Sequence, residues 1–232
     1  MSEQATEDVI ETTLQERVDL YAFLGKSLRD ELDAADLAML AAEPTTARDV
    51  EDADPLDGSD LLKTFREDLG DLDEAETEER IEELAASFGR LFHMDTGVSV
   101  DPYESVYRNG GKLYQESYTK VKKTMDELEY DGYEGHPEPA DHVAFELDFM
   151  AYLGRGALEE YREDNREYAD RYLNLQAEFL ETHLGQWAPR LCDSIAENAD
   201  SAFYEAVARI TKSLVESDPE TIETIRAELN RD

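Results

Sequence analysis

Five consecutive residues, Glu138-Pro139-Ala140-Asp141-His142, place two carboxylates and an imidazole directly before a strongly apolar stretch. Two kinds of chemistry suit this set. A carboxylate can accept two parallel hydrogen bonds from one guanidinium group, so Glu138 or Asp141 could recognise an arginine. Carboxylates and an imidazole can also bind a metal ion, and Glu138, His142 and Glu146 follow one another four residues apart.

The same stretch has the features of a helix start. Proline at the first helical position loses no hydrogen bond, because that N–H has no partner inside a helix anyway. We therefore expect Pro139 to open the helix and Asp141 to lie in its first turn, where the helix dipole favours an anion by about 0.3 to 1 kcal/mol. Replacing Asp141 should then hardly change the stability. Glu138 could instead cap the helix, and His142 could bond to Glu138 or Glu146.

A metal site in a helical bundle needs more ligands than this stretch supplies. Bundle di-iron sites use Glu-x-x-His on two helices, but no acid stands three residues before any of the histidines, which are His93, His136, His142 and His183. The sequence also lacks a Gly-rich phosphate loop, a nucleophile elbow and a dinucleotide fingerprint. We expect a protein that is not an enzyme and uses no cofactor, with a metal-dependent bundle enzyme as an alternative.

A second polar and aromatic group lies upstream, where Tyr103 and Tyr107 flank Ser105. The segment around them, from Asp95 to Gly111, is predicted to be non-helical or barely helical. Aromatic residues on a loop are commoner at binding surfaces than in ordinary connections. The two tyrosines either form such a surface or fill the end of a bundle, and the sequence leaves both uses open.

Helices must position these residues, because apolar side chains recur at helical spacing along almost the whole chain and no segment alternates as a strand does. The helix after His142 is apolar on more than one side, which is typical of the centre of a bundle. Breaks are predicted at Pro44, Pro55 to Gly58, Asp95 to Pro102, Gly110-Gly111, Asp131 to Pro139, Pro189 and Asp218-Pro219. We expect an all-α, single-domain bundle of roughly nine or ten helices over residues 1–232, with a loop from Ala42 to Asp60.

Charge excludes one class of partner. With 22 Lys and Arg against 58 Asp and Glu, the formal net charge is -36, so the chain has no basic surface for a phosphate backbone. Nucleic acid is therefore not an expected partner. The acids are spread along the chain, which suggests adaptation to a cytoplasm rich in salt, where a short Debye length makes an acidic surface tolerable.

Cysteine content and hydropathy indicate the compartment. Cys192 is the only cysteine, so no disulfide within the chain and no thiolate metal cluster can form. Residues Met1 to Ile10 are polar and acidic, and no later segment approaches the roughly 20 apolar residues of a membrane span. We expect a cytoplasmic protein without stable membrane insertion.

Three motifs in the same order resemble those of the TorD/DmsD/NarJ family of molybdoenzyme maturation chaperones, in an acidic, haloarchaeal type. They are Glu138-Pro139-Ala140-Asp141-His142 before an apolar helix, Pro102-Tyr103-Glu104-Ser105-Val106-Tyr107, and His183-Leu184-Gly185-Gln186-Trp187 with Phe203-Tyr204. The resemblance implies an all-α fold. It also implies peptide recognition near the first motif, which falls here on Pro139, Asp141 and His142, with Tyr103, Ser105, Tyr107 and Glu138 as further peptide-binding candidates.

By this resemblance, the partners would be the twin-arginine signal peptide and the apo catalytic subunit of a molybdopterin oxidoreductase of the DMSO, TMAO or nitrate reductase type. The protein would delay export and aid cofactor insertion. An assembly factor that binds the body of a nitrate-reductase-like subunit is an alternative. The sequence leaves open which reductase is the client and whether the chain forms a homodimer.

Overall fold

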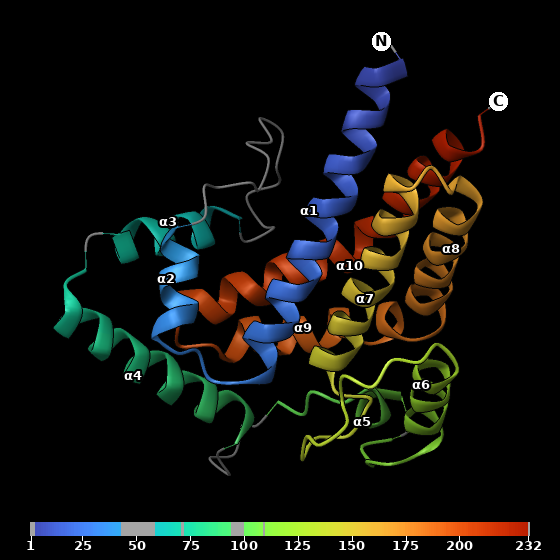
Figure 1. Cartoon of the computed structure of the whole chain (residues 1–232). Helices are drawn as coiled ribbons and strands as arrows, with labels where there is room; N and C mark the ends of the chain where they lie inside the picture. The colour runs from blue at the N-terminus through green and yellow to red at the C-terminus, as the bar shows by residue number, and fades with distance from the viewer. Residues whose placement is uncertain (1–2, 43–58, 71, 94–99, 109, 232) are drawn as a thin grey trace. The chain divides into compact units, whose positions relative to one another are not determined.

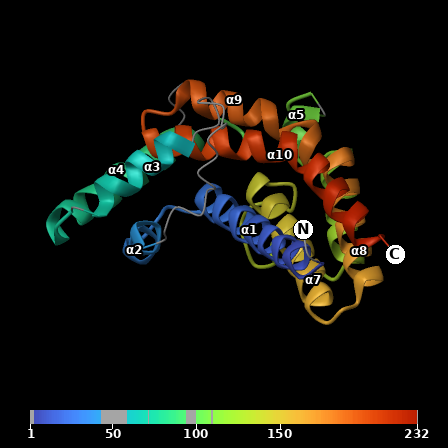
Figure 2. The same ribbon diagram turned by 90° about the horizontal axis from the view of Figure 1, so that it is seen from above.

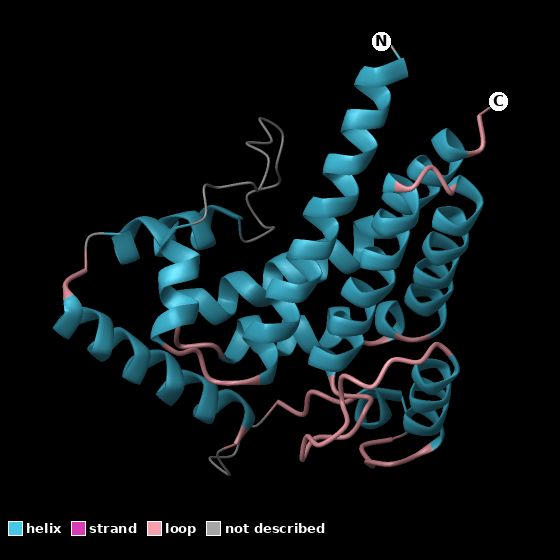
Figure 3. Ribbon diagram, viewed as in Figure 1, coloured by secondary structure: helices cyan, strands magenta, loops and turns pink. Residues whose placement is uncertain are grey.

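Helices dominate the computed structural model, which describes residues 3–42, 59–70, 72–93, 100–108 and 110–231 (Figure 1). Within these residues there are ten α-helices, one 3-10 helix and one isolated β-bridge, without a strand (Figure 3). The predicted all-α class is confirmed, because the helical period of the apolar residues extends through nearly every segment. Most of the loop predicted from Ala42 to Asp60 lies outside the described residues, as does the segment 94–99.

The chain divides into two compact units. The first comprises Met1–Arg29, Tyr103–Ala188 and Val215–Asp232, and the second comprises Asp30–Pro102 and Pro189–Leu214. All residues of the candidate site belong to the first unit. The description of the chain as a single domain stays a prediction.

In the first unit, the central helix is α7 (Val143–Arg162), which packs against α1 (Glu3–Arg29) and α8 (Arg166–Thr182). The three helices run side by side in both views (Figure 1 and Figure 2). Both apolar lines of α7 are buried, since Val143, Leu147, Met150, Phe145 and Phe149 are all 0% exposed. The predicted central position of this helix is confirmed. The remaining elements of the unit are α5 (Glu104–Arg108), α6 (Glu116–Glu127), the 3-10 helix η1 (Leu184–Gln186) and the last part of α10 (Ala202–Leu229).

Two glycines let α1 and α7 approach closely. A Cβ on Gly25 of α1 would lie 2.6 Å from Asp148 Oδ1, and a Cβ on Gly154 of α7 would lie 2.9 Å from Val18 Cγ2. Real Cβ atoms do not tolerate such distances, so the absence of a side chain at these positions fixes how near the two helices pack.

The second unit contains α2 (Ala34–Ala42), α3 (Ser59–Gly70), α4 (Glu74–Phe92), nearly all of α9 (Ala188–Asn198) and the first part of α10. A capping box starts α4, because Glu76 N–H donates to Asp73 Oδ1 (3.0 Å) and Asp73 N–H donates to Glu76 Oε2 (2.9 Å). Phe65 and Phe203 pack with ring centroids 5.0 Å apart in the core of this unit.

One predicted helix break is wrong. Helix α10 continues through Pro219, although proline removes one hydrogen bond and costs a helix interior about 3 kcal/mol. The residues beyond it compensate, since Ile222, Ile225 and Leu229 are 1%, 4% and 5% exposed. Their burial, which contributes about 1.5 to 3 kcal/mol for each side chain, outweighs the lost bond. No helix in the described part of the chain has a stretch long and apolar enough to cross a membrane.

Candidate functional site

Helix α7 begins four residues later than the sequence predicts. His142 is its N-cap, with Nδ1 accepting a hydrogen bond from Ala144 N–H (3.2 Å), and Val143 is the first helical residue. Pro139 lies before the helix, where its carbonyl accepts from His142 N–H (3.0 Å) and closes a turn. The predicted positions of Pro139 and Asp141 inside the first helical turn are therefore wrong. Glu138, one possible cap from the sequence, does not cap the helix, because the side chain of His142 does.

Asp141 serves the preceding helix and not its own. Its carbonyl accepts from Glu104 N–H (2.9 Å) and its Oδ2 accepts from Ser105 N–H (2.9 Å), so it satisfies two free amides at the start of α5. Tyr103 and His142 form the β-bridge between the same two segments. Asp141 is 0% exposed, and its pKa is raised because burial outweighs the hydrogen bonds from Ser105.

Stability should therefore depend on Asp141 more than the sequence suggests. We expect Asp141→Ala to lower the free energy of unfolding by about 1 to 3 kcal/mol, because Ser105 N–H would be buried without an acceptor. Asp141→Asn retains an acceptor and should cost clearly less. Denaturant titration followed by circular dichroism measures both, with Leu147→Ala, expected to cost about 2 to 5 kcal/mol, as a cavity-forming reference. An Asp141→Ala protein as stable as the wild type would refute this role.

Tyr103 and Glu138 form a partly exposed rim beside His142. The Tyr103 hydroxyl donates to Glu138 Oε2, and the Tyr103 ring meets the His142 ring edge-on with centroids 5.3 Å apart. Glu138 and Pro139 are half-buried, whereas His142 is 5% exposed. The rim thus presents a carboxylate that a neighbouring side chain already orients.

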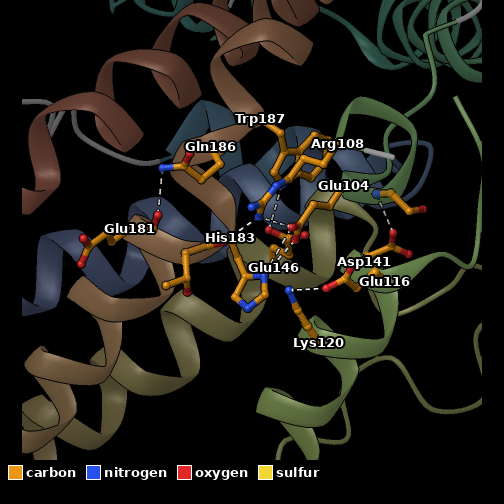
Figure 4. Close-up of polar contacts among 12 residues, drawn as sticks. Glu104, Arg108, Glu116, Lys120, Asp141, Glu146, Glu181, His183, Gln186 and Trp187 are labelled. Carbon is orange, nitrogen blue, oxygen red and sulfur yellow. Dashed lines mark hydrogen bonds and ion pairs between the residues drawn. The ribbon is translucent and has the colours of Figure 1, made fainter. Parts of the chain in front are cut away.

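A largely buried polar cluster, drawn in Figure 4, is formed by residues of α5, α7 and the segment after α8. His183 Nδ1 lies 3.0 Å from Glu104 Oε2, and Arg108 Nη1 donates to Glu104 Oε1 at 2.6 Å. Trp187 Nε1–H donates to Glu146 Oε2 at 3.1 Å. Glu104, Glu146 and Trp187 are all 0% exposed.

Glu146 is the most perturbed acid of the cluster. Burial raises its pKa well above 4.5, and the negative charge of nearby Glu104 adds to the effect, while the bond from Trp187 opposes it. A carboxyl in this environment binds a proton more tightly than it does in water. Glu146 therefore favours its neutral form inside the folded protein.

The seven predicted site residues divide into three groups. Tyr103, Glu138, Pro139 and His142 lie together at the rim; Ser105 and Asp141 lie behind it, both 0% exposed. Tyr107 turns elsewhere and packs against Trp187, with ring centroids 5.5 Å apart. It is half-buried, and its contact with a partner stays a prediction.

Sequence reasoning missed the cluster itself, which consists of Glu104, Arg108, Glu146, His183 and Trp187. One signal was present. Glu146 interrupts the otherwise apolar inner lines of α7, where a carboxylate needs a buried partner. Its partner, the Trp187 indole, lies 41 positions away, so no local pattern could reveal it.

The metal site considered as an alternative, on Glu138, His142 and Glu146, does not have the geometry of a ligand set. Glu138 precedes α7, His142 Nδ1 accepts from a backbone amide, and Glu146 bonds to Trp187, so the three do not form a helical ligand face. Among the described residues, no group of three or more histidines, cysteines and acids is placed to hold a metal ion.

A family model described as the nitrate reductase delta subunit matches residues 59–193, which is more than half of the chain and includes the rim and the buried cluster. The chain belongs to this family. The resemblance to the TorD/DmsD/NarJ chaperones is thereby confirmed.

Several relatives of this chain are named chaperone protein TorD. That of Shewanella pealeana is 28% identical over 164 residues, covering 67% of this chain and 68% of the relative. That of Aeromonas salmonicida is 33% identical over 133 residues, covering 57% and 58%, and that of Vibrio cholerae 27% over 143 residues, covering 62% and 64%. The chain thus spans between 58% and 68% of the length of these relatives.

A solved structure shares the fold. It is a crystal structure of a candidate redox enzyme maturation protein from Archaeoglobus fulgidus, with a TM-score of 0.53 and 18% identity. The match covers 86% of this chain and 93% of that one. At this identity the likeness concerns the fold alone.

Proposed function

We propose that this protein is a cytoplasmic maturation chaperone that binds the twin-arginine signal peptide and the apo form of a molybdopterin oxidoreductase of the DMSO, TMAO or nitrate reductase type. It delays export of the client and keeps it open for cofactor insertion, and it makes or breaks no bond. Membership of a family whose relatives are named chaperone protein TorD supports the general activity.

The observation that carries the proposal is the Tyr103–Glu138 rim. A carboxylate that is partly exposed and held by a tyrosine hydroxyl is prepared to accept hydrogen bonds from a guanidinium group. Buried Asp141 and the N-cap His142 fix the two segments that carry this rim. In this proposal Tyr103, Glu138 and Pro139 contact the peptide, while Ser105, Asp141 and His142 hold the contact residues in place.

The loop that leads to the rim has a suitable charge. Residues 129–138 contain Glu129, Asp131, Glu134 and Glu138 without a lysine or arginine, and the first three are exposed. Paired arginines of a signal peptide are attracted to such a loop. In concentrated salt this long-range attraction is screened, so the oriented Glu138 contributes more to discrimination than the freely solvated acids do.

Binding of a synthetic leader tests the proposal. We expect the protein to bind a twin-arginine leader of a molybdoenzyme catalytic subunit in multi-molar salt, measured by fluorescence polarisation, and to bind its Arg-to-Ala version more weakly. Glu138→Gln should weaken binding about ten-fold, which corresponds to about 1.4 kcal/mol. Glu159→Gln, an equally simple change of an exposed acid near the other end of α7, should leave the affinity unchanged.

The runner-up function is an assembly factor for the body of a nitrate-reductase-like subunit, which the description of the family as the nitrate reductase delta subunit favours. The two functions differ in which part of the client is bound. A protein that captures a client lacking its leader, yet binds no isolated leader, would reject signal-peptide recognition and support the runner-up.

A further inference from the structure

Arg108 makes an unusual pair of contacts within the buried cluster. Its Nη1 donates both to Glu104 Oε1 and to the carbonyl oxygen of Thr182, each at 2.6 Å (Figure 4). The guanidinium thus joins the first residue of α5 to the last residue of α8. A carboxylate and a helix C-terminal carbonyl are both favourable neighbours for a cation.

Glu104 is held in position by groups other than Arg108. Glu104 is 0% exposed and its other oxygen, Oε2, is held by His183 Nδ1 at 3.0 Å. By contrast, the Arg108 side chain is 35% exposed and is the last residue of the short helix α5. The carboxylate is fixed and enclosed, whereas the guanidinium enters from the solvent side.

Further buried polar atoms belong to residues that adjoin Glu104 or interact with it. Among the described residues, five buried side-chain atoms lack a hydrogen-bond partner, and three of them are Ser105 Oγ, Asp141 Oδ1 and Glu146 Oε1. All three belong to residues that are 0% exposed. Buried polar atoms are normally satisfied, and a guanidinium carries five N–H donors. The Ser105 hydroxyl can donate and neutral Glu146 carries an O–H, so Asp141 Oδ1 is the one atom of the three that acts only as an acceptor.

We propose that Glu104 and the Thr182 carbonyl form a guanidinium-binding site that Arg108 fills in the free protein. An arginine of the incoming peptide replaces Arg108 there, while the other arginine of the pair binds Glu138 at the rim. The replacement by a peptide arginine rests on the proposed function. The existence of a guanidinium site does not, and the two parts can be tested separately.

Chemical rescue tests the site alone. Arg108→Ala leaves the buried Glu104 without its cation, so the variant should melt several degrees below the wild type. Millimolar L-argininamide should raise the melting temperature of the variant, because a ligand that binds only the folded state stabilises it. L-lysinamide should have much less effect, since an ammonium is more strongly hydrated than a guanidinium and loses more on leaving water for this enclosed place. Wild-type protein, whose site is filled, should not respond to either compound.

Arg171→Ala supplies the matched control. Arg171 also pairs with a glutamate four residues before it, Glu167, but there the side chains are 61% and 77% exposed. This variant should melt like the wild type and should show no rescue. If Arg108→Ala proves too unstable to purify, Arg108→Gln keeps a donor for Thr182 and carries the same test.

Leader affinity tests the replacement. If Arg108 competes with the peptide, Arg108→Ala should bind the twin-arginine leader about ten-fold more tightly than the wild type. The wild type can bind a peptide arginine only in the minor state in which Arg108 has left the site, whereas the site of the variant is always open. Changing one leader arginine to lysine should remove this gain. Fluorescence polarisation in multi-molar salt measures both.

The outcomes separate the two ideas. Absence of rescue by L-argininamide in both Arg108 variants overturns the guanidinium site. Rescue together with unchanged or weaker leader binding by Arg108→Ala overturns the replacement by a peptide arginine. Rescue in a protein that binds no leader at all leaves the site intact and rejects the proposed function.

Discussion

Asp218→Ala should lower the free energy of unfolding by about 3 to 5 kcal/mol, because it leaves a buried arginine without its counter-charge. Asp218 binds Arg17 through two parallel bonds, Nε to Oδ1 at 2.6 Å and Nη2 to Oδ2 at 2.7 Å. Tyr21 donates its hydroxyl to the same carboxylate at 2.8 Å, and Arg17 also donates to Gln176 at 2.9 Å. The four residues are at most 5% exposed, so water cannot replace the lost partner.

A second Arg–Asp pair in the same unit serves as the control. Arg226 donates to Asp170 at 2.9 Å, but its side chain is 32% exposed and that of Asp170 is 23% exposed. Asp170→Ala should therefore cost about 1 kcal/mol or less. Urea titration of both variants followed by circular dichroism gives the comparison. Equal costs for the two variants would mean that burial does not strengthen the dependence on Asp218.

Apolar replacement of the whole pair sharpens the test. Arg17→Met combined with Asp218→Leu removes both charges and should be clearly more stable than Asp218→Ala alone, because no buried charge is left uncompensated. A double variant that is less stable than Asp218→Ala would show that the bonds from Tyr21 and Gln176 need the charged pair.

Glu146→Gln should change how stability depends on pH. The pKa of Glu146 is raised in the folded protein, so the folded state holds a proton that the unfolded chain has already released. The resulting stability is fully present below about pH 4.5, the ordinary value of the carboxyl, and is lost as the pH rises through the folded-state pKa. The loss is about 1.4 kcal/mol for each pH unit between the two pKa values.

Glutamine imitates the protonated acid and still offers an oxygen to Trp187. We expect the variant to match the wild type below about pH 4.5 and to exceed its stability increasingly at higher pH, up to the folded-state pKa. Glu104 and Asp141 face Glu146 and stay unchanged, and the raised pKa of Asp141 contributes to both proteins in the same direction. Denaturant titrations over a pH series measure the difference. A constant difference between wild type and variant across that series would contradict a proton bound at Glu146.

Half-buried acids with a paired cation make stability depend on pH in the opposite direction. Hydrogen bonds from Arg226 lower the pKa of Asp170, so this carboxylate contributes stability that is present above its ordinary pKa and lost as the pH falls. The wild-type protein therefore loses stability both at low pH, through acids such as Asp170, and at high pH, through Glu146. Only the difference between wild type and Glu146→Gln isolates the buried acid.

The sequence by itself determined the class of the fold and the neighbourhood of the site. Helical spacing of apolar residues predicts α7 as a central helix, since two apolar lines on one helix need neighbours on two sides. The motifs around Tyr103 and Glu138 stand apart in the chain, yet their order within a known family indicated that they act together. The β-bridge between Tyr103 and His142 joins them.

Helix boundaries were harder to predict from the sequence, because proline has several local preferences that conflict. Proline favours the first turn of a helix, but the chain at Pro139 forms a tight turn that lets Asp141 satisfy the amides of α5. Proline also breaks helices, but Pro219 lies inside α10 because the apolar residues after it continue at helical spacing and are buried. In both places long-range contacts decided between two local preferences that the sequence could not rank.

Only the tertiary structure placed Glu104, Arg108, Glu146, His183 and Trp187 in one cluster. Residue types at distant positions do not show which side chains will share a buried space, and Glu146 stands out from the 58 acids without revealing its partner. Burial makes the difference, because it raises the pKa of Glu146 and encloses the carboxylate that Arg108 meets. The sequence determined which helices form, and the way they pack decided which few of the many acids carry the chemistry, since a charge matters most where water is excluded.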